Sequence, residues 1–576
     1  MNKKKKTAVA VRNRWRRIER LPKLGLSKIL DELSSRKLVR YTVYLTAVAV
    51  FFTLILVPPI AGIVIKWDTL GEVYAQPELM SQALNAITNS FAVALLVSAL
   101  DITTGVPMAW LITRGKSKWL NVLDTLSDIP FIVPTAALGY SLLLFWSKSE
   151  GVSALFGQSL ISPGWLLVIL LHFTFSYPVV VRVVVGALLD YKKEYENASR
   201  TLSAPPFTAA RTVTFPIIKP SIIAAFLLAF SRSISETGAT IMVAGMTANG
   251  NYVSSFENGA TFIQTHLGPN KEITGAAVFV SFFLLIISCS IFIAIRLLGT
   301  RLGMPLKKVW PAAERRISYS KATATRNGLS LTIFFILILI PSIFVALPAL
   351  EAIFTDTLQN ALSSMGVWSE YWQSLFLSYS LGAIVTILNL IIGLPMAIII
   401  ARRKLGSLPS TILDILVNIP LIVPSIALGV SLRIFWKSFP TIPEMWLLIF
   451  AHLTITYPYF VRAVSAAVER IGTDLEEASR TLGAKPLGVF RTIILPLTKY
   501  SMLSGAIMVF TRSISETGAT LAVTTLKTAP VVIVDWVKLS PQFTPLEIGL
   551  GCGILILFSF IVLLALRFIV KGKGRY

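Results

Sequence analysis

Long apolar runs separated by short polar loops recur along the whole chain. Twelve of these runs have about the length, roughly 20 residues, that an α-helix needs to cross a lipid bilayer. They lie at 41–65, 88–112, 126–147, 163–188, 220–245, 273–298, 328–350, 372–400, 411–436, 445–468, 500–525 and 546–570. The pattern predicts an all-α polytopic membrane protein with twelve spans.

Basic residues are concentrated in every second loop between these runs. The loops at 67–87 and 351–371 contain no Lys or Arg, whereas the loops that follow the even-numbered runs are basic. Because cytoplasmic loops of membrane proteins carry the excess of Lys and Arg, we expect both termini to lie in the cytoplasm. The chain should therefore be a multi-pass protein of the cell membrane, with an uncleaved basic tail before its first span.

The two halves of the chain repeat each other. GVPMAWLITRGK at Gly105 matches GLPMAIIIARRK at Gly393, and SRSISETGAT at Ser231 matches TRSISETGAT at Thr511 with nine of ten residues identical. DIPFIVPTAALG at Asp128 also matches NIPLIVPSIALG, whose prolines predict kinks or short broken segments. Since each half has six spans, the halves share one orientation, which implies a pseudo-twofold axis along the membrane normal.

The repeat divides the chain into two tandem six-helix halves with polar ends and a polar connection. We expect an N-terminal tail at 1–40, a first half at 41–298, a cytoplasmic linker at 299–327, a second half at 328–571 and a C-terminal tail at 572–576. Hydrophobic residues make up 54% and charged residues 14% of the chain, which is typical of membrane proteins. The net charge of +24 is spread over short clusters between the spans, so it indicates topology rather than nucleic-acid binding.

A charged stretch occurs twice on the expected cytoplasmic face, as ENASRTLSAPP and EEASRTLGAKP. In each copy a short amphipathic helix should end at Ser203 or Gly483, before prolines that stop it. A glutamate and an arginine lie four residues apart in each helix and can pair. Two equivalent helix-turn-helix protrusions with small apolar faces suit docking into a soluble partner that is itself a dimer.

These stretches resemble the signature loop of the membrane subunits of binding-protein-dependent ABC importers, in which EAA is followed by a glycine and then a Leu-Pro pair. The second copy matches at Leu495-Pro496, and the first has Phe215 before Pro216. The resemblance implies coupling helices that seat in two ATP-binding-cassette ATPase subunits, and an extracytoplasmic solute-binding protein as a further partner. The coupling residues that it implies are Glu196, Ala198, Arg200, Ser203, Glu476, Ala478, Arg480 and Gly483.

The same resemblance extends over almost the whole chain and implies the type I importer permease fold. Two fused six-span halves are similar to ferric-iron and thiamine permeases, whereas SISETGAT is similar to a segment of sulfate and molybdate permeases. Ferric iron, thiamine and a small oxyanion therefore all stay open as the solute.

Charged residues also occur inside two of the apolar runs. Arg232 precedes Glu236 by one helical turn, and Arg512 precedes Glu516 in the same way. A charge there costs about 2.5–3.5 kcal/mol, so these side chains should be paired and face the interior of the helix bundle. Two interpretations stay open: the pairs form part of a gate or translocation path, or they fix helix packing.

Other features predict no enzymatic chemistry. No phosphate loop of the form G-x-x-x-x-G-K-[ST] occurs, nor any catalytic or metal-ligand pattern, so we expect no catalytic residue, metal or cofactor, and ATP hydrolysis on separate subunits. His172 and His452 precede Tyr-Pro pairs and suit a structural role better than a proton relay. Cys289 and Cys552 stand alone in apolar runs.

Two functions other than that of an importer subunit are weighed. An ion-coupled secondary transporter can also contain two six-span halves, but it has no evident use for paired cytoplasmic protrusions. A membrane scaffold would leave the intramembrane charges unexplained, and it predicts that removing the charges of Glu236 and Glu516 leaves function intact.

Overall fold

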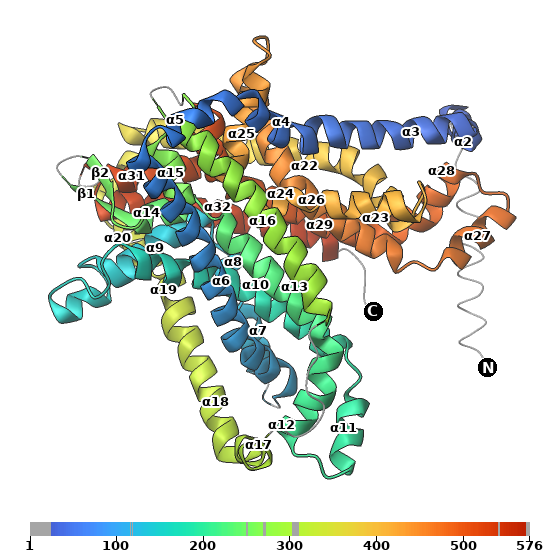
Figure 1. Ribbon diagram of the computed structural model, residues 1–576, viewed down its shortest axis with the longest axis horizontal. Coiled ribbons are helices and arrows are strands. Elements are labelled where there is room, and N and C mark those ends of the chain that lie inside the picture. Colours follow the sequence, from blue (N-terminus) through green and yellow to red (C-terminus); the bar gives the residue numbers. More distant parts are fainter. Residues whose placement is uncertain are drawn as a thin grey trace.

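The chain is almost entirely helical in a computed structural model, which describes residues 25–115, 117, 119–248, 251–268, 272–301, 310–539 and 542–571 (Figure 1). The first tail as far as residue 24, part of the linker and the tail at 572–576 lie outside the described residues. Elements of the first half are α2 Gly25–Ser35, α3 Lys37–Val50, η1 Phe51–Leu56, α4 Val57–Ile65, η2 Trp67–Leu70, α5 Gly71–Tyr74, α6 Pro77–Arg114, α7 Leu120–Leu126, α8 Ile129–Ile132, α9 Thr135–Ser147, η3 Val152–Phe156, α10 Trp165–Asp190, α11 Lys193–Thr201, α12 Pro206–Ala209, η4 Ala210–Thr214, α13 Phe215–Ser235, α14 Gly238–Ala244, β1 Gly245–Ala248, β2 Asn251–Ser254, α15 Gly259–Thr265 and α16 Gly275–Arg301.

The second half largely repeats this order of elements, but the first half also contains the short helix η3 after α9 and an antiparallel β1–β2 hairpin after α14. Its elements are α17 Pro311–Ser318, α18 Ser320–Ile333, η6 Phe334–Leu339, α19 Ile340–Ile343, α20 Ala346–Ile353, α21 Asp356–Leu362, α22 Val367–Ala401, α23 Ser407–Leu416, α24 Ile419–Ile422, α25 Ser425–Lys437, α26 Glu444–Glu469, α27 Thr473–Thr481, α28 Pro486–Val489, η7 Phe490–Ile494, α29 Leu495–Ile514, α30 Gly518–Val523, α31 Ala529–Lys538 and α32 Pro545–Lys571.

Among the described residues, ten helices are long and apolar enough to cross a membrane, and the number rises to twelve if each of two bent helix pairs is one span. The bent pairs replace the continuous spans expected at 126–147 and 411–436, with bends of 102° and 105°. Val133 and Val423 are extended at the bends because each precedes a proline, which disfavours the helical conformation. Of the two outcomes expected from the prolines, a kink or a broken segment, the structure has the broken segment.

Two other expected spans are also interrupted. The runs at 220–245 and 500–525 each contain a long helix, α13 or α29, followed by a separate short helix, α14 or α30. The breaks fall at Glu236 and around Glu516. A carboxylate within an apolar segment can accept the free N–H groups of the next helix, so the charge that interrupts the span also begins a new helix.

The first span of each half packs against the opposite half. Phe51 stacks on Tyr457 with ring centroids 5.7 Å apart, and Tyr177 stacks on Phe334 at 6.3 Å. Each contact joins the first span of one half to the fourth predicted span of the other. The halves are therefore interlocked, and the buried cores combine residues from both.

This exchanged packing is especially close at Gly62 in α4. A Cβ atom added there would lie 1.9 Å from the carbonyl oxygen of Ser431 in α25, far inside van der Waals contact. Only glycine allows the two helices to approach this closely. Gly186 in α10 offers a contrast, because a Cβ atom there would meet nothing within 4 Å.

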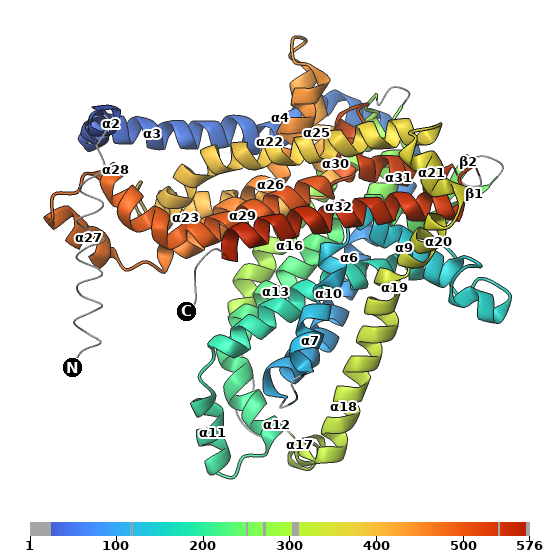
Figure 2. The same cartoon turned by 180° about the vertical axis from the view of Figure 1, so that it is seen from behind.

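The helices form two arms that are joined at one end and diverge toward the other (Figures 1 and 2). One arm ends in α11, α12 and α17, and the other ends in α27, α28 and α2. Both repeated charged stretches thus lie at the free ends of the arms.

Candidate functional site

The two repeated loops have the same backbone geometry. After α11 and α27 the chain turns through Ser203 at φ 64° and Gly483 at φ 84°. In the first loop the N–H of Ala204 bonds to the Ser199 carbonyl at 3.3 Å and that of Ser203 to the Arg200 carbonyl at 3.0 Å, and the second loop repeats both bonds. This is the Schellman pattern, which satisfies the last carbonyls of a helix. The predicted ends of both helices are confirmed.

The apolar face expected for docking is open. Leu202 and Leu482, which directly precede the turns, are 85% and 89% exposed, and Ala198 and Ala478 are also exposed. Leucines this exposed at the tips of both arms leave two small apolar surfaces available to a partner.

Glu196 and Glu476 point away from these surfaces and are buried. Glu476 forms an ion pair with Arg402 at the end of α22, with Nε 2.8 Å from Oε1, and Arg480 lies farther away at 3.9 Å. Glu196 lies 3.5 Å from Arg114 at the end of α6. The pair four residues apart that the helical spacing allows forms in the second loop, at 3.9 Å. In each loop, however, the closest basic partner among the described residues is the arginine that ties the loop to the second span of its half, α6 or α22.

Sequence reasoning missed Arg114 and Arg402, although a signal was present. They are the matching last residues of the repeated GVPMAWLITR and GLPMAIIIAR segments. Positive charge is crowded at this arm end. Burial, together with the nearby charge of Arg480, lowers the pKa of Lys404 from its ordinary value. The buried carboxylate of Glu476 offsets that crowding.

A short helix that precedes the first span of the opposite half braces each loop, and we call α17 and α2 the brackets. On α17, Glu314 is buried, pairs with Arg211 at 3.1 Å and accepts a 2.5 Å hydrogen bond from the Thr208 hydroxyl. The Ser318 hydroxyl accepts from the backbone N–H of Phe207 at 3.1 Å. The first repeated loop is thereby held through buried, charge-assisted contacts.

The bracket α2 contacts the second loop in a similar position. The Ser34 hydroxyl accepts from the backbone N–H of Leu487 at 3.2 Å, which matches the bond at Phe207. Its ion pair, between Glu32 and Lys485, is 3.8 Å long and exposed. The expected tail and linker thus both contribute helices that contact the loops.

The repeated SETGAT segments meet each other where the arms join. A Cβ atom added at Gly238 would lie 2.0 Å from the hydroxyl oxygen of Thr517, and one added at Gly518 would lie 2.6 Å from that of Thr237. The two contacts are reciprocal, as a pseudo-twofold axis requires. The axis expected from the repeat passes between these segments.

Reciprocal hydrogen bonds from the broken third spans close the same junction. The Thr135 hydroxyl donates to the Ser515 carbonyl at 3.0 Å, and the Ser425 hydroxyl donates to the Ser235 carbonyl at 3.1 Å. Each donor is the first residue of the second helix of a bent pair, α9 or α25. Each acceptor directly precedes the glutamate of the other half. Movement of a bent pair would therefore act directly on the opposite SETGAT segment.

Each glutamate of the junction caps a short helix. Oε1 of Glu236 accepts from the N–H of Ala239 at 3.1 Å, and Oε1 of Glu516 accepts from that of Ala519 at 2.9 Å. Both residues are buried. The capping bond gives each carboxylate a structural role, because it stabilises the first turn of the short helix that follows in the same half.

Both intramembrane histidines are fully engaged in hydrogen bonds. His172 lies 2.8 Å from the Ser233 hydroxyl and 2.9 Å from that of Thr240, and His452 contacts Ser513 and Thr520 in the same way. These bonds fasten the fourth predicted span to both sides of the SETGAT break. The geometry agrees with the structural role expected for them.

The two arginines at the junction differ from each other. Arg512 forms the expected pair with Glu516, at 2.5 Å. In the described part of the chain, Arg232 has no carboxylate within 4.0 Å; instead its Nε donates to the Phe175 carbonyl at 3.0 Å. The pairing predicted for Arg232 and Glu236 is therefore wrong, because contacts with another helix turn the guanidinium away.

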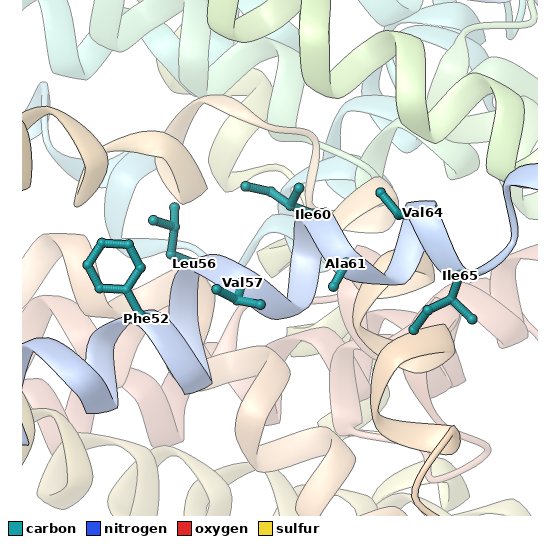
Figure 3. Close-up of a pocket in the computed structure, with 7 residues that line it drawn as sticks. All are labelled: Phe52, Leu56, Val57, Ile60, Ala61, Val64 and Ile65. Atoms are coloured by element: carbon teal, nitrogen blue, oxygen red, sulfur yellow. The ribbon is translucent and has the colours of Figure 1, made fainter.

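Two further observations limit where a solute could bind. The described residues contain no group of three or more His, Cys, Asp or Glu side chains that could hold a metal ion. A groove on the first span has only apolar lining, which suits lipid rather than a charged solute (Figure 3). Its lining residues are Phe52, Leu56, Val57, Ile60, Ala61, Val64 and Ile65.

Comparison with known proteins gives matches to both halves. The family described as binding-protein-dependent transport system inner membrane component matches residues 101–304 and 393–572. The sulfate transport system permease protein CysT of Salmonella typhimurium is 33% identical over 227 residues, which cover 37% of this chain and 79% of that protein. The Escherichia coli CysT is 31% identical over the same shares. The putative ferric transport system permease protein FbpB 1 of Haemophilus influenzae is 24% identical over 541 residues, 88% of this chain and 81% of that protein.

Proposed function

The chain belongs to the family of binding-protein-dependent transport system inner membrane components, and from this we propose that it forms the complete transmembrane pathway of an ATP-driven importer. One polypeptide supplies both halves of the pathway, because the family match occurs once in each half. It acts as a transport subunit of the inner membrane rather than as an enzyme.

We propose that two ATPase subunits dock on α11–α12 and on α27–α28, at the ends of the arms. The observation that carries this proposal is the matched pair of exposed leucines, Leu202 and Leu482, each held out by the same Schellman turn. Two equivalent surfaces suit a partner with twofold symmetry. The orientation of the termini follows the basic loops, so both termini and both loops lie in the cytoplasm.

In this proposal the diverging arms are the inward-open state of an alternating-access cycle. ATP-driven approach of the two ATPase subunits draws the arm ends together, and the buried pairs of Glu196 and Glu476 transmit the movement to α6 and α22. The bent pairs then pull on the SETGAT junction through Thr135 and Ser425. Opening of that junction admits a solute delivered by an external binding protein.

The solute is proposed to be a small one, of the kinds named by the relatives, sulfate or ferric iron. The sulfate permease relatives match 37% of this chain, whereas the ferric permease relative matches 88% of it. Thiamine, suggested by the fused arrangement, is a third candidate. The specificity would reside largely in the external binding protein.

A pull-down of the tagged chain from its native membranes in mild detergent tests the proposal. Mass spectrometry should find a P-loop ATPase at two copies per permease chain, and Leu202→Asp with Leu482→Asp should release it. Uptake by the permease without any ATPase, driven by a proton or sodium gradient, would instead establish the secondary-transporter alternative.

A further inference from the structure

Arg232 and Arg512 occupy matching positions of the repeat but have different electrostatic surroundings. Arg512 is neutralised by Glu516 at 2.5 Å. Arg232 has no such partner within the described residues, and Oε1 of Glu236 is engaged by the N–H of Ala239. One half of the junction therefore presents a guanidinium group without a counter-charge in contact.

An aromatic pair holds this guanidinium in place. The Arg232 Cζ lies 3.8 Å from the ring centroid of Phe175 and 4.6 Å from that of Phe131. The second half has Leu421 and Ile455 at the matching positions, where no such cation–π contact can form. The two arginines therefore differ because of residues outside the repeated SISETGAT segment, at positions where the halves have different side chains.

The contacts made by Arg232 leave one edge of its guanidinium unused. The two rings contact the guanidinium, and Nε donates to the Phe175 carbonyl. The two Nη groups remain as paired donors, an arrangement that matches two oxygens of an oxyanion. Arg232 is only partly buried and Phe131 is 44% exposed, so this edge is not sealed by packing.

We propose that Arg232, held against Phe131 and Phe175, is a binding site for a tetrahedral oxyanion of the sulfate class during its passage through the junction. A guanidinium inside a membrane bundle is costly when no anion contacts it, and a passing dianion would provide that contact. The described residues offer a ferric ion no cluster of ligands. The inference rests on the proposed import function and narrows its solute to an anion.

The test uses the permease assembled with its ATPase subunits and binding protein in liposomes, with radiolabelled sulfate as the probe. Arg232→Gln should lower ATP-driven sulfate uptake about tenfold or more, since charge-assisted hydrogen bonds are lost. Arg232→Lys keeps the charge without the forked donors and should be several-fold impaired. Phe131→Leu with Phe175→Ile gives the first half the residues of the second and should also impair uptake.

Controls separate a binding defect from a folding defect. Lys321→Gln removes an exposed positive charge on α18 and should leave uptake unchanged. If Arg232→Gln fails to assemble, the other two variants decide the question, because both keep a positive charge at position 232. These are Arg232→Lys and the double variant Phe131→Leu with Phe175→Ile.

Normal sulfate uptake in Arg232→Gln, or in both other variants, overturns the inference and leaves the import function standing. Uptake of ferric iron but not sulfate by the wild-type complex has the same consequence. A wild-type complex that assembles no ATPase and transports neither solute overturns the proposed function itself.

Discussion

Replacing Glu476 with glutamine should detach the second repeated loop, the proposed docking site on α27–α28, from its arm. Glu476 and Arg402 are joined at 2.8 Å and their side chains are only 7% and 8% exposed, so solvent screens the pair little. Removing one partner of a buried ion pair costs about 3–5 kcal/mol, because the other charge is left unpaired. At the lower end of that range, the population of detached loops rises roughly a hundredfold.

The same change at Glu196 provides an internal comparison. Its contact with Arg114 is longer, 3.5 Å, and the arginine is 15% exposed. We expect a smaller cost there, because the contact is longer than a charge-assisted hydrogen bond. Glu196→Gln should therefore leave the first loop largely attached. The double variant Glu196→Ala with Glu476→Ala should uncouple ATP hydrolysis from uptake.

Hydrogen exchange of the amides in α27 measures detachment directly, and the ratio of ATP hydrolysed to solute imported measures its consequence. Glu476→Gln should lower the protection of α27 and raise this ratio, with membrane insertion unchanged. A double-mutant cycle with Arg402→Gln isolates the pair. Strictly additive effects in that cycle would refute the assignment of the ion pair as the tie between loop and arm.

Further changes test other parts of the structure. Ser203→Gly should stabilise the first loop by about 1 kcal/mol, because the backbone of Ser203 is in the left-handed region. Gly483→Val should destabilise the second loop for the same reason. Thermal unfolding of the assembled complex compares the two variants. Gly62→Ala should cost about 1–3 kcal/mol through overpacking and reduce the yield of folded protein, whereas Gly186→Ala should not. Glu314→Gln should cost about 3 kcal/mol at the first bracket and expose α12 to proteolysis.

The features that the sequence alone predicted correctly are those with local causes. The turn at Ser203 was predictable because a helix that meets two prolines must end, and the residue just past its end adopts a positive φ even when it is not glycine. The broken third spans were predictable from their prolines for the same reason. The repeat then placed each feature twice.

Features that depend on contact between distant segments could not be read from one sequence. The helical spacing predicted Arg232 beside Glu236, but Phe175, 57 positions away, provides the carbonyl that Arg232 binds instead. The partner of Glu476 is likewise 74 positions distant. Spacing within a helix shows which pairs are possible, whereas tertiary packing decides which of them form.

The exchange of first spans between the halves has a consequence for biosynthesis. Phe51 can reach Tyr457 only after the chain has been extended by some four hundred residues, so the first span must wait in the bilayer without its final neighbours. Separate subunits would have to find each other by diffusion at that stage. Fusion into one polypeptide keeps the waiting helix close to its destination, at an effective concentration set by the chain rather than by expression.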